Sequence, residues 1–245
     1  MRKFFKEVFN YKETKCTIIS DTASGIQIAT ESIKRNRGQL EKYIIVNPKF
    51  VWTLKPYPSP EEPLIANLMA KASQKADVGP MAAVAGVLAD LAVKDMVADG
   101  CRVAIVEDGG EVSAVSNVPI DVAFAAGDEP LSKRFSFRLT EFPFGVATSS
   151  GRFSHALSFG DAEAATIFCR EAGLADAAAT AVGNSVKGED PIGAIKKGLN
   201  VAKLISGVEG VLILYKQRVG TWGKIPQIVK VTPTDKQSLL SSDVL

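Results

Sequence analysis

Three segments of this chain combine residue types that can bind a phosphate, hold a cation or move a proton. The first covers residues 145–151, where Thr148, Ser149 and Ser150 stand between two glycines, the second of which is Gly151. Hydroxyls and backbone amides in a loop of this kind suit a phosphate or a metal-bound oxyanion. The alternative is a surface loop whose hydroxyls bond to its own backbone.

The only histidine of the chain, His155, follows this segment by four residues. Its imidazole titrates near neutral pH and can therefore act as a general base. A purely structural histidine is the alternative, and the neighbouring hydroxyls favour the functional role.

The second segment is residues 107–111, which read Glu-Asp-Gly-Gly-Glu. A pair of glycines between apolar runs predicts a hairpin turn. Glycine also lets a ligand approach the backbone closely, and the carboxylates could bind ribose hydroxyls or a hard cation. We therefore expect Asp108, Gly109, Gly110 and Glu111 to form a turn that can also bind a ligand.

The third segment places Asp176 and Thr180 four residues apart in a predicted helix, so that both side chains share one face. A carboxylate and a hydroxyl can give two oxygens to Mg²⁺, which keeps water molecules in its other positions. The alternative is an exposed helix start, where aspartate is common because it complements the helix dipole.

The elements that must position these segments alternate between strands and helices. Apolar periodicity predicts a strand pair over 5–19, helices over 24–42, 65–76, 80–99, 174–184 and 191–204, and strands over 102–106, 112–115, 122–124, 135–139 and 162–168. A closing hairpin is expected over 211–231, and a proline-rich, ordered connector over 48–63. This mixture predicts a single α+β domain, mainly antiparallel sheet with packed helices. Its parts would be residues 1–63 (hairpin, helix and connector), 64–231 (core) and 232–245 (frayed tail).

Composition disfavours several classes of protein. Of the 245 residues, 46% are hydrophobic, and 29 basic against 27 acidic residues leave a net charge of +2. Nucleic-acid binding needs clustered cations, which this balance does not favour. Three widely spaced cysteines match neither a disulfide framework nor a metal motif. No apolar run approaches the roughly 20 residues of a membrane span, and the first 19 residues carry no export signal. We expect a cytoplasmic protein without a nucleic-acid or membrane partner. The sequence is compatible with an oligomer.

In this order, the motifs resemble those of the ApbE superfamily, whose best-known members are FAD:protein FMN transferases. The likeness is most specific to a small uncharacterised prokaryotic family of ApbE relatives and spans nearly the whole chain. It is carried by residues 78–86 (Val-Gly-Pro-Met-Ala-Ala-Val-Ala-Gly), the glycine turn, 148–151 (Thr-Ser-Ser-Gly), 155–160 (His-Ala-Leu-Ser-Phe-Gly), 175–180 (Ala-Asp-Ala-Ala-Ala-Thr), 183–184 (Gly-Asn) and 208–223.

The resemblance implies roles for individual residues. Asp176 and Thr180 would hold Mg²⁺, and Thr148, Ser149 and His155 would be catalytic. A flavin nucleotide such as FAD would contact the remaining positions, namely Gly79, Gly86, Asp90, Asp108, Gly109, Gly110, Glu111, Ser150 and Gly151.

Two functions follow from this resemblance. The first is a flavin-transferase-type enzyme with a Mg²⁺-assisted pocket for a nucleotide-like or phosphorylated ligand. The alternative is a non-catalytic accessory or ligand-binding component in sulfur assimilation and homocysteine formation, with a partner protein of sulfur metabolism. Two departures from the transferases favour the alternative. Ala85-Gly86 replaces Lys-Gly, and Leu157-Ser-Phe-Gly160 replaces Asp-Pro-x-Thr-Gly.

Overall fold

Strand pairing organises the chain into one large and one small antiparallel sheet. The computed structural model describes residues 4–124, 135–150 and 160–230. The strands are β1 (Phe5–Tyr11), β2 (Thr14–Ser20), β3 (Val103–Asp108), β4 (Glu111–Ser116), β5 (Ile120–Ala123), β6 (Phe135–Leu139), β7 (Phe144–Ser149), β8 (Ala164–Cys169), β9 (Gly210–Tyr215), β10 (Arg218–Gly223) and β11 (Gln227–Lys230). The helices are α1 (Ala23–Val46), α2 (Lys49–Trp52), α3 (Leu64–Ala76), the 3₁₀ turn η1 (Pro80–Ala83), α4 (Val84–Ala98), α5 (Ala172–Ser185) and α6 (Pro191–Leu204).

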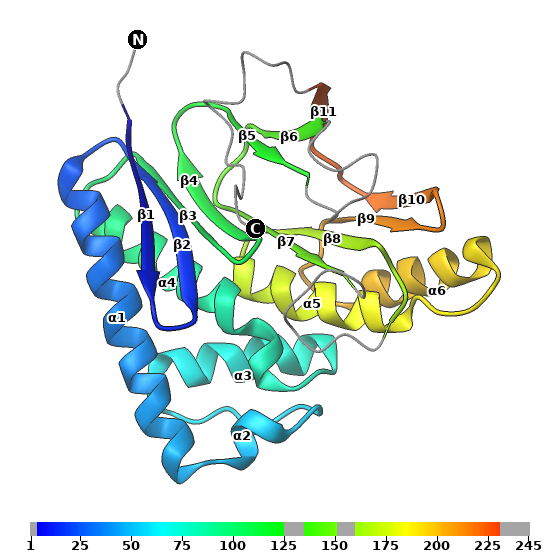
Figure 1. Ribbon diagram of the computed structural model, residues 1–245, viewed down its shortest axis with the longest axis horizontal. Helices are drawn as coiled ribbons and strands as arrows, with labels where there is room; N and C mark the ends of the chain where they lie inside the picture. The colour runs from blue at the N-terminus through cyan, green and yellow to red at the C-terminus, as the bar shows by residue number, and fades with distance from the viewer. Residues whose placement is uncertain (1–3, 125–134, 151–159, 231–245) are drawn as a thin grey trace.

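The large sheet has the strand order β1-β2-β3-β4-β7-β8-β9-β10, and each neighbouring pair is antiparallel. The helices lie together on one side of this sheet (Figure 1). Side chains alternate between the two faces of a strand. Ala165, Ile167 and Cys169 of β8 accordingly join the apolar core with α3, α4 and α5, whereas Ala164 and Phe168 belong to a different core.

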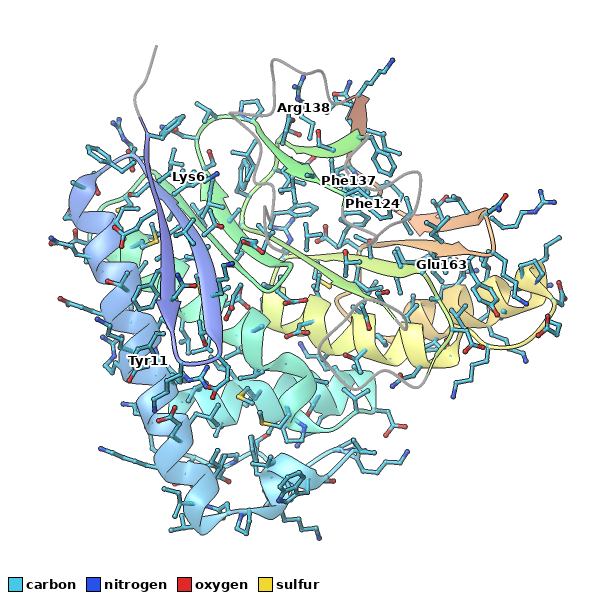
Figure 2. All side chains as sticks on the ribbon, viewed as in Figure 1. Lys6, Tyr11, Phe124, Phe137, Arg138 and Glu163 are labelled. Atoms are coloured by element: carbon cyan, nitrogen blue, oxygen red, sulfur yellow. The ribbon has the colours of Figure 1, made fainter. Side chains whose placement is uncertain are left out.

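That second core lies between the large sheet and the small sheet, whose order is β11-β6-β5. Phe137 of β6 is almost fully buried, and its ring lies 4.9 Å from the ring of Phe168 in β8. Figure 2 shows Phe137 and Phe124 on the side of the large sheet away from the helices. The molecule is therefore a layer of helices, a large sheet and a partial second sheet.

Small residues let α4 and α5 approach each other closely. A Cβ atom on Gly86 of α4 would lie 2.3 Å from the carbonyl oxygen of Ala172 in α5, and one on Gly173 would lie 2.5 Å from Val87. A Cβ atom at Gly86 would clash with backbone, and one at Gly173 would clash with a side-chain methyl group. The motif residues on these two helices are thus brought together by direct backbone packing.

The predicted fold class is confirmed: one α+β domain, mainly antiparallel sheet with packed helices. Most predicted elements are present, with ends shifted by a few residues. Two predictions were wrong. Residues 145–149, expected as a loop, belong to strand β7, and β11 pairs with β6 in the small sheet instead of closing a hairpin with β10. The connector also contains the short helix α2. The expected tail lies outside the described residues, and the internal boundaries remain predictions.

Candidate functional site

Two acidic side chains, Asp108 and Glu111, lie side by side on the helix-facing side of the large sheet with Cys16 next to them. We call these two carboxylates the acidic row. Cys16 of β2 is the cross-strand partner of Asp108 in β3, and Asp108 is the partner of Glu111 in β4. Directly opposite residues in an antiparallel pair share a face. Ser113, two residues after Glu111, donates a hydrogen bond of 2.7 Å to Asp90 of α4. The acidic row and Cys16 therefore face the helices.

The turn that connects β3 and β4 is held by its own acidic residue. Gly109 and Gly110 have φ angles of +67° and +109°, which glycine adopts without strain. The Gly110 N–H donates to Glu107 Oε1 at 2.9 Å. The predicted hairpin is present, and one of its three carboxylates stabilises the turn.

Asp176 of α5 is electrostatically coupled to this row. Its Oδ2 accepts a hydrogen bond of 3.0 Å from the backbone N–H of Gly86 in α4, and the side chain is half-buried. Burial, together with repulsion from Asp108 and Asp90, raises the pKa of Asp176 to about 7. Burial and the negative charges of Asp176 and Asp108 raise the pKa of the half-buried Glu111 well above its usual range.

The carboxylates of β3 also have raised pKa values. Asp108 is buried, and burial together with repulsion from Glu107 raises its pKa to about 7. Arg37 opposes this shift only weakly, because its ion pairs are made with Glu13 and Glu41. The site is thus a set of mutually repelling carboxylates that a bound cation would stabilise.

Thr180 lies one helical turn after Asp176 and is half-buried like it. The predicted pair therefore shares one face of α5, with the carboxylate next to the acidic row. In the described part of the chain, no group of three or more His, Cys, Asp and Glu side chains is arranged to hold a metal ion. A cation at this position would accordingly use one carboxylate, one hydroxyl and water, a donor set that fits Mg²⁺.

Asp90 connects elements of the protein instead of facing open space. Its two carboxylate oxygens accept hydrogen bonds of 3.0 and 2.9 Å from the backbone N–H groups of Ala172 and Gly173, the first residues of α5. With the bond from Ser113, this makes Asp90 the link between α4, α5 and β4. Burial raises the pKa of Asp90 to about 6.

The predicted ligand-binding glycines Gly79 and Gly86 sit at close backbone contacts. A Cβ atom on Gly79 would lie 2.0 Å from the carbonyl oxygen of Thr53. Gly86 touches Ala172 and donates its N–H to Asp176. Both glycines therefore have packing roles, and Gly86 also orients the carboxylate of Asp176.

The hydroxyl segment divides between the two faces of β7. Thr148 shares a hydrogen bond of 2.9 Å with Thr166, its cross-strand partner on β8. Ser149 faces the other side, where its hydroxyl lies 3.3 Å from the position of a Cβ atom on Gly183 in α5. Ser150 is buried, and Gly151 and His155 lie outside the described residues. The structure brings Ser149, but not Thr148, to the face of β7 that packs on α5.

Sequence reasoning missed two members of this site. The sequence assigned Cys16 no role in a site, because the three cysteines match no disulfide or metal motif; Cys16, Cys101 and Cys169 are free and buried. The position of Cys16 beside Asp108 depends on the β2–β3 register, which carries no local signal. The amide of Gly86 was likewise missed as a donor to Asp176, because it depends on helix packing.

Comparison with known proteins places the chain in a family. The family model described as "AbpE bacteria" matches residues 6–200. A UPF0280 protein of Methanosarcina acetivorans is 39% identical over 233 residues, covering 94% of this chain and 91% of that protein. A UPF0280 protein of Methanococcus maripaludis is 38% identical over 245 residues, covering 98% of each chain.

Solved structures share the fold at low sequence identity. The flavinyl transferase ApbE of Pseudomonas stutzeri, in its apo form, aligns with a TM-score of 0.58 and 16% identity over 90% of this chain and 94% of that one. The ApbE protein of Thermotoga maritima aligns with a TM-score of 0.58 and 14% identity over 96% and 99%. From the family match, the UPF0280 relatives and the shared fold, the chain belongs to the AbpE bacteria family and, through it, to the ApbE-like superfamily.

Proposed function

We propose that this protein binds a flavin nucleotide or a related phosphorylated ligand at the acidic row, together with a divalent cation held by Asp176 and Thr180. One observation carries this proposal. Burial raises the pKa values of Asp108, Glu111 and Asp176, and repulsion from neighbouring carboxylates adds to each rise: Asp176 and Asp108 act on Glu111, Asp108 acts on Asp176, and Glu107 acts on Asp108. A cation relieves that repulsion and at the same time lets a negatively charged pyrophosphate approach.

The fold supports the same ligand class. Proteins named flavin transferases share this architecture over at least 90% of this chain. Mg²⁺, once bound, would neutralise charge on the phosphates, which is the chemistry that it supplies in phosphoryl transfer. The Gly86 amide would keep Asp176 oriented toward the cation, and Ser149 would be available for hydrogen bonding near α5.

In the transferase form of this proposal, FAD is the donor and a serine or threonine hydroxyl the acceptor. The acceptor oxygen forms a phosphoester bond to the FMN phosphorus, the pyrophosphate bond to AMP breaks, and the hydroxyl proton passes to a base. The resemblance assigns that base to His155.

Thermal unfolding with FAD, with Mg²⁺ and with both tests the binding proposal. We expect FAD and Mg²⁺ together to raise the melting temperature by roughly 5–10 °C at about a hundred times Kd, because only the folded state binds them. Asp176→Asn should abolish this rise. Asp77→Asn is the matched control, because it removes an exposed carboxylate at the left-handed residue after α3, where asparagine is well tolerated. No shift with any combination would contradict the proposal.

A non-catalytic accessory is the second candidate, and the position of Thr148 favours it. That hydroxyl is hydrogen-bonded to Thr166 on the face of β7 opposite Ser149. Incubation with FAD, Mg²⁺ and a Ser/Thr acceptor peptide separates the two candidates. Release of AMP, reduced by roughly 10²–10⁴ in His155→Ala, supports the transferase. Binding without AMP release supports the accessory, and a pull-down would then test for a partner of sulfur metabolism.

A further inference from the structure

The segment that joins α1 to α2 exposes several large apolar side chains. Ile45 and Val46 end α1 and are 77% and 75% exposed. Trp52, the last residue of α2, is 80% exposed, and Leu54, two residues later, is 57% exposed. We call these four residues the apolar corner. Figure 1 shows α2 at the lower edge of the molecule, beside the C-terminal end of α1. Exposed apolar groups gathered in one ten-residue segment differ from the scattered ones found on most protein surfaces.

A buried aromatic side chain anchors the apolar corner to the core. Phe50, between the two exposed pairs, is fully buried, and its ring packs edge-on against Tyr43 and Tyr57 at 5.2 and 5.3 Å. The backbone after α2 packs directly on Gly79. The exposed side chains therefore stand on a segment whose backbone is anchored by a buried ring and a close backbone contact.

The charged residues that flank the apolar corner in the sequence are all positive. Residues 42–55 contain Lys42, Lys49 and Lys55, all exposed, and no acidic residue. Lys55 makes only a loose ion pair of 3.8 Å with the exposed Asp77. A second copy of the same corner would bring lysines against lysines, which disfavours self-association through it. An anionic surface complements this pattern.

We propose that the apolar corner docks on the surface of an anionic lipid bilayer. The tryptophan and aliphatic side chains of the corner would enter the headgroup region, while the flanking lysines would contact the lipid charges. In this contact the protein lies on the membrane surface and does not cross the membrane. Among the residues that the structure describes, no single helix has the length and composition to cross a membrane, and only the pair Leu64–Ala76 and Pro80–Ala98, bent by 101°, meets that test. This proposal departs from the sequence-based expectation of no membrane partner.

Cosedimentation of the full chain with lipid vesicles tests the proposal. We expect binding to vesicles that contain phosphatidylglycerol, weakened by added salt, and little binding to pure phosphatidylcholine. The double variant W52S/L54S should lower the partition coefficient about tenfold or more, because two large apolar groups no longer enter lipid. Lys49→Gln should lower it about fivefold, the effect of one lysine near such a surface.

Leu204→Ser is the control, because Leu204 is 85% exposed at the end of α6 and lies outside the corner. It should leave vesicle binding unchanged. Absence of binding, equal binding to both vesicle types, or an equal loss in Leu204→Ser would overturn the proposal. So would sedimentation showing a dimer that W52S/L54S dissociates without any change in vesicle binding, since the corner would then serve a second copy.

Discussion

At the scale of single residues, the acidic row and Asp176 bring carboxylates together in a place where burial and repulsion both disfavour their charged forms. Folding places Asp108, Glu111 and Asp176 close enough for their charges to interact, and burial raises their pKa values. Such pKa shifts reduce stability at neutral pH, and clusters of this kind are typical of functional sites. The native state holds protons on this row where the unfolded chain would release them.

Replacing Asp176 by asparagine should therefore stabilise the protein without ligand. The folded-state pKa of about 7 lies above the ordinary value of 3.8. Between about pH 4 and 7 the folded state thus binds more protons than the unfolded state, and the free energy of unfolding falls as pH rises. Asp176→Asn removes part of that fall, while its amide oxygen can still accept from Gly86. We expect it to be more stable than the native chain by about 1–2 kcal/mol at pH 8, and nearly equal at pH 3.

Chemical denaturation at the two pH values measures this difference. Asp77→Asn should change neither value appreciably, because its carboxylate is exposed. Equal stability of Asp176→Asn and the native chain at pH 8 would show that the row is not strained by its charges.

At the scale of elements, two helices that meet through glycines position the site. The Gly86 amide can reach Asp176 only because α4 and α5 touch backbone to backbone. Local sequence predicted both helices, since both segments are rich in alanine, the strongest helix former, and Pro80 suits the start of the first one. Strand β7 was missed because Gly, Thr and Ser are typical of loops, whereas pairing with β4 and β8 decides its conformation.

The same limit applies to the acidic row. The turn at Gly109 and Gly110 could be predicted from four residues, and the shared face of Asp176 and Thr180 from helical spacing. The position of Asp108 between Cys16 and Glu111 could not, because it depends on which strands pair and in which register.

Gly86→Ala should test the helix contact. A Cβ atom there would meet the Ala172 carbonyl group at 2.3 Å, so the helices must separate. We expect a loss of about 2–4 kcal/mol in the free energy of unfolding, the range of severe steric changes in a core. Gly38→Ala in α1 is the matched control, with no atom within 4 Å of the new Cβ. It should stabilise the protein by about 0.5–1 kcal/mol through helix propensity, and an equal response of the two variants would contradict the close packing.

Asp90→Ala should be destabilising for a different reason. It leaves the N–H groups of Ala172 and Gly173 and the hydroxyl of Ser113 without their acceptor. Lost capping and unsatisfied buried groups predict a loss of about 2–4 kcal/mol, read from denaturant midpoints. Asp90→Asn keeps acceptor oxygen and should lose less. A neutral effect of Asp90→Ala would show that water replaces the carboxylate.

At the scale of the whole molecule, the site joins two layers: one carboxylate comes from the helix layer and two come from the large sheet. Asp176 belongs to a helix after β8, whereas Asp108 and Glu111 lie in the hairpin of β3 and β4. Cation binding in this arrangement would connect the helix layer to the sheet. A negatively charged nucleotide would be repelled by the row unless a cation is present, so the two ligands should bind with strong mutual dependence.

Calorimetric titration at pH 6, 7 and 8 tests this coupling. Protons held by Asp176 and Asp108, with pKa values of about 7, compete with the cation. Mg²⁺ affinity should therefore rise with pH, by up to about tenfold per pH unit for each proton released. FAD added first should increase Mg²⁺ affinity by the same factor by which Mg²⁺ increases FAD affinity, since binding free energies are reciprocal. Asp176→Asn should abolish Mg²⁺ binding and with it the coupling to FAD. FAD binding that is equally tight in EDTA would contradict the coupling, because the carboxylates would then not hinder the nucleotide.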